Sequence, residues 1–361
     1  MRLFRCGNCN NPVYFENNRC THCGSDLGYL PTENIMVAFR YAGETQVEPP
    51  GLGPVRMCAN YHQHQICNWL LPVDSTDPYC LSCRLNRTIP DLSQPGNLQR
   101  WHTLETEKRQ LIYSLLRLGL PFHPFSEGAG GLGFDFLADQ PPHQRPEHPV
   151  MTGHDQGLIT INIAEADAVA RGAKRNQMAE SYRTVLGHFR HESGHYFWDQ
   201  LVWNTPWLPS FRDLFGDERM PYQAALSTYY NQGPPAGWHH LYVSQYASSH
   251  PWEDWAETWA HYLHMIDTLE TAYQFGMRFL APTRSGEPQE PLMTFAPYQQ
   301  TSFAILIDYW LPLTVALNSL NRSMGHPHAY PFTLSPKAIE KLAFVHELVS
   351  NYRHANNNDM T

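Results

Sequence analysis

The sequence has no cysteine beyond Cys83, no internal repeat and no excess of positive charge. Its formal net charge is -9 at pH 7, which makes nucleic acid a poor partner. The start MRLFRCGNCNNPVYF lacks the apolar core of a secretory signal. The longest apolar run, FAILIDYWLPLTVAL, is interrupted by Asp308 and Pro312 and is too short to span a bilayer. We therefore expect a cytoplasmic protein that binds neither a membrane nor nucleic acid.

The composition is that of a globular protein large enough to bury a substantial core. Of the 361 residues, 42% are hydrophobic and 16% are charged. This length allows one large domain plus a smaller one. The 29 prolines and 20 histidines indicate long ordered loops.

The eight cysteines all lie in the first quarter of the chain and mark a separate module. Cys6 and Cys9 form one C-x-x-C pair, and Cys20 and Cys23 form a second pair beyond a short predicted hairpin. This is the spacing of a zinc-ribbon or rubredoxin-like site, in which each tight turn supplies two thiolates to a tetrahedral metal. We expect a structural zinc here.

The remaining cysteines are Cys58, Cys67, Cys80 and Cys83, of which the last two again have the C-x-x-C spacing. A second four-cysteine zinc site leaves no thiol unpaired, so we expect a second structural zinc.

Three alternatives remain open for this module. His62 and His64 could compete as ligands, although a place on the surface suits them better. Disulfides would require an oxidising compartment, which the missing signal disfavours. Four thiolates also hold iron, and the sequence does not distinguish the two metals.

After the cysteines, the periodicity of apolar residues predicts a helix over 103–118 and a half-buried strand over 158–163. Between them, GAGGLG (128–133) matches a dinucleotide-binding pattern, but no strand leads into it and no helix follows, so we interpret it as a loop. Long helices are predicted over 178–203 and 251–275, and two more follow in the C-terminal third.

The first of these long helices contains HESGH, in which His191 and His195 are four residues apart. Residues at this spacing lie one turn apart on the same helical face and can bind one metal ion. Glu192 is rotated by about 100° from His191 and can act as a base on a water without being a ligand. The alternative is an aromatic-rich buried helix whose histidines are satisfied by hydrogen bonds.

A catalytic zinc needs a third protein ligand and an open position. The metzincin continuation is excluded, because Leu201 stands where a histidine would be needed and Trp198 where a glycine would be needed. The segment WEDWAETWAHYLH offers Glu253 and Glu257 one turn apart, so that one can bind zinc while the other orients a ligand histidine. Either glutamate could be the ligand.

HESGH followed by YASSHPWEDWAE resembles the glutamate-zincins, and especially the peptidase domain of anthrax lethal factor. The resemblance implies that Glu253 is the ligand, that Glu257 orients a ligand histidine and that the Tyr246 phenol stabilises the oxyanion. Tyr242 is close by, and either tyrosine could be ordinary packing. Three other histidines, His188, His261 and His264, are expected to be structural or to support the ligands without binding the metal. The tryptophans nearby are expected to form core around the active-site helices: Trp198, Trp203, Trp207, Trp252, Trp255 and Trp259.

The whole chain resembles bacterial zinc-binding metallopeptidases with an N-terminal zinc-ribbon region, through CNWLLP, CLSCRLNRTIPDLS, GHFRHESGHYFWD and HPWEDWAETWAHYLH. The resemblance implies an α+β fold. A small zinc-ribbon or rubredoxin-like module over 1–90 precedes a mainly helical zincin-like domain with a small β-sheet over 91–361.

The expected function is hydrolysis of a peptide or protein substrate at one catalytic zinc, with two structural zincs in the ribbon module. We also expect the strand to offer a free edge to the substrate through Thr160 and Asn162. Two rivals remain: an interaction module with a structural or inactive third metal site, and a zinc amidase that acts on a non-protein amide. The sequence does not determine the oligomeric state.

Overall fold

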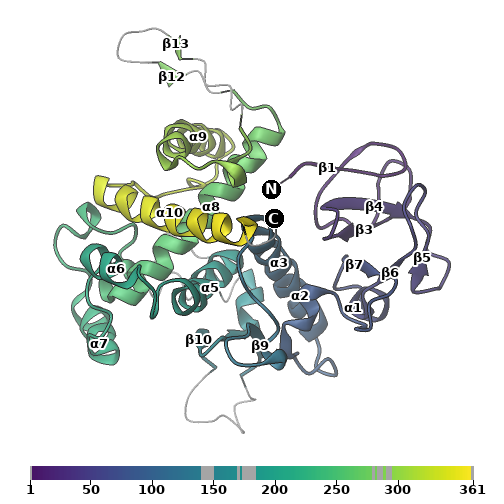
Figure 1. The fold of residues 1–361 in the computed structure, drawn as a ribbon, viewed down its shortest axis with the longest axis horizontal. Coiled ribbons are helices and arrows are strands. Elements are labelled where there is room, and N and C mark those ends of the chain that lie inside the picture. The colour runs from purple at the N-terminus through teal and green to yellow at the C-terminus, as the bar shows by residue number, and fades with distance from the viewer. Residues whose placement is uncertain are drawn as a thin grey trace. The chain divides into compact units, whose positions relative to one another are not determined.

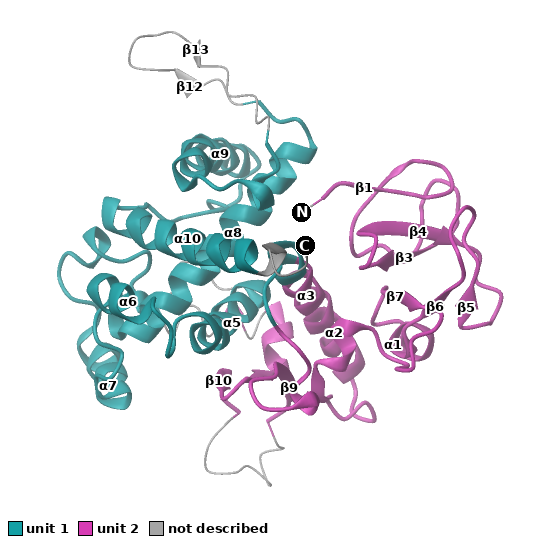
Figure 2. Ribbon diagram, viewed as in Figure 1, with its two compact units in different colours: residues 1, 114–121, 177–361 teal, residues 2–113, 122–176 magenta. Residues whose placement is uncertain are grey.

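The computed structural model of the chain describes residues 2–139, 150–168, 171–172, 184–278, 281–282, 288–289 and 295–358 (Figure 1). The chain divides into two compact units (Figure 2). The cysteine unit, magenta in the figure, contains residues 2–113 and 122–176, and the helical unit, teal, contains residues 114–121 and 177–361. The predicted domain boundary after residue 90 stays a prediction.

The cysteine unit consists of short strands and short helices. They are β1 (Phe4–Arg5), β2 (Pro12–Val13), β3 (Asp26–Leu30), β4 (Ile35–Phe39), β5 (Gln46–Val47), β6 (Val55–Met57), α1 (Ala59–His64), β7 (Leu70–Pro72), α2 (Leu81–Arg84), β8 (Asn86–Thr88), η1 (Phe125–Glu127), β9 (Gly133–Leu137), β10 (Gly153–Asp155), β11 (Leu158–Asn162) and η2 (Ile163–Ala166). β1 pairs with β2 and β3 with β4, while two larger sheets have the orders β5-β6-β7 and β10-β11-β9-β8. The long helix α3 (Asn97–Leu118) begins in this unit and ends in the helical unit.

An aromatic cluster forms part of the core of the cysteine unit. The rings of Phe15 and Tyr29 are 4.9 Å apart, those of Tyr29 and Trp69 are 5.1 Å apart, and Tyr113 packs 5.3 Å from Phe15. Strands this short bury little surface each, so bound metal has to supply much of the stability of such a module.

The predicted strand is present as β11, but it is not a free edge. β10 pairs with it on one side and β9 on the other, and Thr160 lies opposite Gly153 and Asp135. Asn162 is buried, and its amide donates to Asp139 Oδ2 at 3.1 Å. The expectation of a free edge is therefore wrong, because β11 has a neighbouring strand on each side, while a role of Thr160 and Asn162 in substrate binding stays a prediction.

The glycine-rich stretch at 128–133 leads from η1 into β9. A dinucleotide-binding loop would instead lead from a strand into a helix. The structure thus agrees with the interpretation of this stretch as a loop of another kind.

The helical unit is built around one long central helix. Its elements are α5 (Val185–Leu201), α6 (Leu208–Phe215), α7 (Tyr222–Gln232), η3 (Trp238–His240), η4 (Tyr246–Ser249), α8 (Pro251–Gln274), β12 (Ala281–Pro282), β13 (Pro288–Gln289), η5 (Pro297–Gln299), α9 (Phe303–Ser323) and α10 (Pro336–Asn358). α8 packs against α5, α6, α9, α10 and η4. The predicted α+β class is confirmed: a small cysteine-rich module precedes a mainly helical domain, and the sheets are small.

Local capping explains where α5 and α8 begin. The Thr184 hydroxyl accepts a hydrogen bond from the Gly187 N–H at 2.9 Å, so α5 begins at Val185. Residues 178–183 of the predicted helix lie outside the described residues. α8 begins at Pro251, where a missing N–H costs nothing, and extends to Gln274, close to the predicted range.

α5 and α8 approach each other closely at Gly194. A Cβ on this residue would lie 2.9 Å from the Cα of Ala256, so only glycine fits without a shift of the backbone. Two indole N–H groups of α8 reinforce the contact, since Trp255 donates to the Gly194 carbonyl at 2.8 Å and Trp259 donates to Ser193 Oγ at 3.1 Å. This close contact fixes the register of the two helices that carry the predicted metal ligands.

α9 differs from the sequence prediction. It continues through Asp308 and Pro312 as a helix of 21 residues, and its most apolar window has a mean hydropathy of 1.5. The prediction that this run is too short to cross a membrane is therefore wrong by length and composition alone. Among the described residues it is the one helix with these properties, and 33% of the window is buried. The core helix of a soluble protein can be equally long and apolar.

Candidate metal centre and active site

The helical unit brings together two histidines of α5 and one glutamate of α8. Ligand atoms of His191, His195 and Glu253 all lie within 4.8 Å of one another. His191 Nε2 is 2.9 Å from Glu253 Oε2, and His195 Nε2 is 3.6 Å from Glu253 Oε1. Two imidazoles and one carboxylate are the ligand set of a catalytic zinc that keeps an open position. These three residues therefore fit a zinc ion.

Charge in this cluster is balanced between the carboxylate and the imidazoles. Burial opposes ionisation of Glu253, which is 1% exposed, but His195 and His191 hold its pKa well below the usual range. Burial also opposes protonation of His191, yet hydrogen bonds to Glu253 and Glu257 raise its pKa well above the usual value. A metal ion would replace this proton, so metal binding at this centre should release protons.

Glu257 contacts the other nitrogen of the His191 ring. Its Oε1 is 2.8 Å from His191 Nδ1, and its Oε2 accepts a hydrogen bond from Ser244 Oγ at 2.6 Å. The Ser244 hydroxyl also accepts from the Ala247 N–H at 3.1 Å. When Nδ1–H donates to a carboxylate, the Nε2 lone pair is free to bind a metal. Glu257 is thus placed to orient His191.

Glu192 is buried on α5 between the two histidines in sequence. Burial raises the pKa of its carboxyl group, and the histidines on either side partly oppose that rise. A base is most effective when its pKa lies near the working pH, so this environment suits proton transfer.

Two tyrosines border the cluster. The ring of Tyr246, in η4, is 5.9 Å from the ring of His191, and burial raises the pKa of its phenol well above the usual value, which keeps it a hydrogen-bond donor. Tyr242 instead packs against Lys341, whose Nζ lies 4.5 Å from the centre of its ring. The second tyrosine at the cluster is Tyr222 of α7, whose hydroxyl donates to Glu253 Oε1 at 2.5 Å.

Sequence reasoning missed Tyr222 and Ser244. Tyr222 is the first residue of α7, and Ser244 lies in the loop between η3 and η4. Neither lies at a spacing that a helix or strand relates to HESGH, so only the three-dimensional structure could place them.

The histidines expected to be structural have other partners. His261 Nδ1 is 2.7 Å from the Tyr330 hydroxyl, and His264 is hydrogen bonded to Arg190. His188 is not part of the ligand cluster in the described residues. Trp198, Trp255 and Trp259 are buried and Trp207 and Trp252 are half-buried, but Trp203 is 52% exposed, so the expectation of a core position is wrong for Trp203.

The cysteine unit contains both predicted four-cysteine groups. In the first, Cys6 Sγ lies 3.7 Å from Cys23 Sγ, and Cys9 Sγ lies 3.7 Å from Cys20 Sγ. Thiolates about 2.3 Å from a tetrahedral zinc are separated by roughly this distance, whereas disulfide sulfurs are about 2.05 Å apart. The disulfide alternative is therefore wrong, and the geometry fits a metal.

The second group is fully buried and consists of Cys58, Cys67, Cys80 and Cys83. Cys67 Sγ and Cys80 Sγ are again 3.7 Å apart. His62 is exposed, and its Nδ1 is 2.7 Å from the Tyr41 hydroxyl, while neither His62 nor His64 belongs to the group. Both groups have four thiolates and no open position, which suits structural metals.

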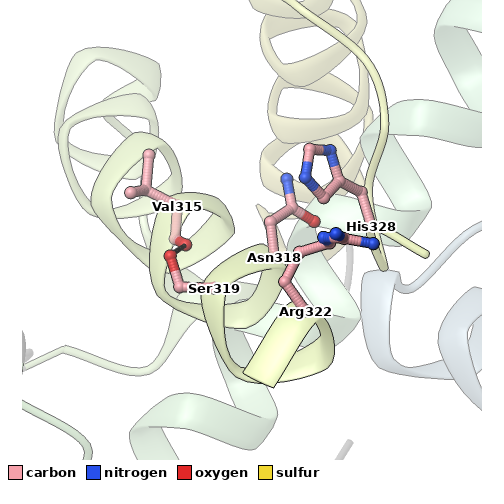
Figure 3. Close-up of a pocket in the computed structure, with 5 residues that line it drawn as sticks. All are labelled: Val315, Asn318, Ser319, Arg322 and His328. Carbon is pink, nitrogen blue, oxygen red and sulfur yellow. Dashed lines mark hydrogen bonds between the residues drawn. The ribbon is translucent and has the colours of Figure 1, made fainter. Parts of the chain in front are cut away.

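A separate pocket of about 490 Å³ lies on the C-terminal half of α9 (Figure 3). Its lining residues are Val315, Asn318, Ser319, Arg322 and His328. These side chains include no carboxylate and no thiol, and none of them belongs to the metal cluster. The pocket therefore adds nothing to the predicted chemistry.

Comparison with known proteins identifies relatives over nearly the whole chain. The family described as "Putative zinc-binding metallo-peptidase" matches residues 97–348, and a zinc-ribbon domain matches residues 3–94. Uncharacterized proteins from Mycobacterium bovis and from two strains of Mycobacterium tuberculosis are each 40% identical over 351 residues, which is 97% of this chain and 95% of each relative. No solved structure matches the chain. Together with two four-cysteine groups and a His/Glu cluster, these matches show that the chain belongs to the family with this description and carries a zinc-ribbon domain before the region that the family matches.

Proposed function

We propose that this chain hydrolyses peptide bonds at a zinc ion held by His191, His195 and Glu253. The observation that carries the proposal is the convergence of these three side chains within 4.8 Å, beside a buried glutamate that is not a ligand. The two cysteine groups are proposed to bind structural zinc.

A bound zinc ion would supply Lewis acidity, which activates a water molecule and polarises the substrate carbonyl. Glu192 takes a proton from the attacking water and passes it to the leaving nitrogen. Tyr246 donates a hydrogen bond to the oxygen on which negative charge develops. Glu257 keeps the His191 ring in the orientation and tautomer that binding requires.

The proposed substrate is a peptide or protein. The rival substrate, a non-protein amide, would use the same residues, so the centre alone does not select between them. A structural or inactive third metal site would need no buried carboxylate beside the ligands, and the position of Glu192 therefore favours an enzyme.

The test is a screen of a peptide library by mass spectrometry with the wild-type protein and the Glu192→Gln variant. We expect cleavage by the wild type and a loss of at least about 100-fold in the variant, because a general base contributes about 10²–10⁴-fold. The zinc content of the variant should be unchanged.

The same variant also serves as a trap, since it should still bind what it can no longer cleave. Mass spectrometry of the material that co-purifies with Glu192→Gln would identify a peptide or a different amide. No peptide cleavage by the zinc-loaded wild type, or equal cleavage by the variant, would contradict the proposal.

A further inference from the structure

We propose that Tyr222 is a positioning residue of the metal centre, which holds one oxygen of Glu253 so that the carboxylate offers only the other oxygen to the metal. The Tyr222 hydroxyl donates to Glu253 Oε1 at 2.5 Å, a length typical of a bond from a hydroxyl to an ionised carboxylate. Glu253 Oε2 lies 2.9 Å from His191 Nε2, whereas Oε1 lies 3.6 Å from His195 Nε2, so Oε2 is the oxygen nearer to a ligand nitrogen. The inference rests on the proposed function, which makes Glu253 a ligand.

His250 ties the segment before Tyr222 to the start of α8. Its Nε2 lies 3.1 Å from the carbonyl oxygen of Met220, and its Nδ1 accepts a hydrogen bond from the Trp252 N–H at 3.1 Å. A single neutral tautomer satisfies both bonds, with the proton on Nε2. The backbone just before Tyr222 is therefore anchored to the turn that carries Glu253.

The Tyr222 ring is enclosed by the same turn. It packs edge-on against His250 at 5.1 Å and against Trp252 at 6.3 Å, and it is half-buried. No residue of α7, Tyr222 included, is fully buried. Tyr222→Phe keeps the ring and its packing and removes only the hydroxyl, so the fold should stay intact.

Tyr222 and Glu257 act on different ligands. Glu257 fixes the ring of His191 through Nδ1, whereas Tyr222 fixes the carboxylate of Glu253 through Oε1. A carboxylate bound through one oxygen occupies one position on the metal and leaves another open for the reaction. Without the phenol, the second oxygen is free to turn toward the metal and close that position.

The test uses full-length protein that retains both cysteine-bound zincs but has lost the third metal to a mild chelator. Titration with Zn²⁺ should show that Tyr222→Phe binds the third zinc about 10–100-fold more weakly than the wild type. Titration with Co²⁺ should give a weaker visible absorption, because a second carboxylate oxygen raises the coordination number. The melting temperature before metal addition should not change.

Two matched tyrosine variants serve as controls. Tyr230→Phe lies on the same helix, where its side chain is 56% exposed, and should behave as the wild type in both titrations. Tyr246→Phe should lose activity but keep the wild-type zinc affinity and cobalt spectrum, because its proposed partner is the substrate.

Wild-type zinc affinity together with a wild-type cobalt spectrum in Tyr222→Phe would overturn the inference. Metal binding by the His191→Ala variant distinguishes failure of this inference from failure of the proposed function. If His191→Ala loses the third metal and Tyr222→Phe does not change, only the role of Tyr222 is wrong. If His191→Ala still binds a third metal as the wild type does, the proposed centre itself is wrong.

Discussion

At the scale of single residues, two carboxylates of α8 contact opposite nitrogens of one imidazole. Glu253 faces His191 Nε2 at 2.9 Å and also approaches His195, while Glu257 faces His191 Nδ1 at 2.8 Å and is held by Ser244. Of these two glutamates, only Glu253 lies near both His191 and His195. The geometry therefore favours Glu253 as the ligand, whereas the sequence left both glutamates open.

This division of roles predicts different outcomes for two matched variants. Glu253→Gln removes a charged ligand and should abolish binding of the third zinc at micromolar concentration. Glu257→Gln should retain it with an affinity about 10–100-fold lower, as expected for a group that orients a ligand. Competition with a chromophoric chelator measures both affinities. The opposite order of effects would make Glu257 the ligand.

The sequence predicts the residues of the site that obey a helical period and misses those that do not. His191, Glu192 and His195 share one helix, and a regular repeat of 3.6 residues relates their directions. Tyr222 reaches Glu253 from another helix across a loop, and no local rule encodes that approach.

At the scale of elements, the site depends on how closely α5 approaches α8. An added Cβ at Gly194 would be 2.9 Å from a backbone atom of Ala256 and 3.2 Å from the Trp259 side chain. A backbone atom cannot rotate away, so the helices would have to separate. The proposed metal ligands, which come from both helices, would separate with them.

We therefore expect Gly194→Ala to lower the free energy of unfolding and weaken third-zinc binding together. Overpacking lowers the free energy of unfolding by about 1–3 kcal/mol, while the higher helix propensity of alanine raises it by at most about 1 kcal/mol. The net effect should therefore be destabilising. Urea unfolding and zinc titration measure the two effects. Gly153→Ala, where an added Cβ meets no atom within 4 Å, is the control. A Gly194→Ala protein as stable as the wild type would contradict the packing argument.

Element boundaries were predictable where local chemistry sets them. The range of α8 follows from Pro251 and the periodic apolar face, and it was predicted closely. The neighbours of β11 were not predicted, because β10 and β9 pair with it through backbone contacts that leave little mark on the sequence. Because these neighbouring strands were not predicted, the expectation that β11 has a free edge was wrong.

At the scale of the whole molecule, buried histidines should make stability depend on pH. Burial lowers the pKa of His261 to about 4 from an unfolded value of 6.5. Between these values the unfolded chain binds a proton that the folded chain does not, so stability is present above pH 6.5 and is lost as the pH falls toward 4. The full loss from His261 alone is about 3 kcal/mol.

His261→Gln should flatten this dependence, because glutamine stays neutral and can still bond to the Tyr330 hydroxyl. Urea unfolding at several pH values between 4 and 7 measures the slope for each protein. His240→Gln, an exposed position, should keep the wild-type slope. Equal slopes for His261→Gln and the wild type would show that His261 does not contribute.

The asymmetry of composition along the chain indicates two kinds of metal site, and each kind belongs to one unit. All eight cysteines lie in the cysteine unit and form two closed groups, while the His/Glu cluster lies in the helical unit. The closed groups are suited to stabilise a module of short strands, and the open cluster is suited to chemistry.

The central claim is that His191, His195 and Glu253 hold a third zinc ion, and the zinc content per chain tests it most directly. Inductively coupled plasma mass spectrometry should find about three zinc ions in the wild type and about two in His191→Ala, since the four-cysteine groups do not depend on His191. Two ions in both proteins, or three in both, would contradict the claim.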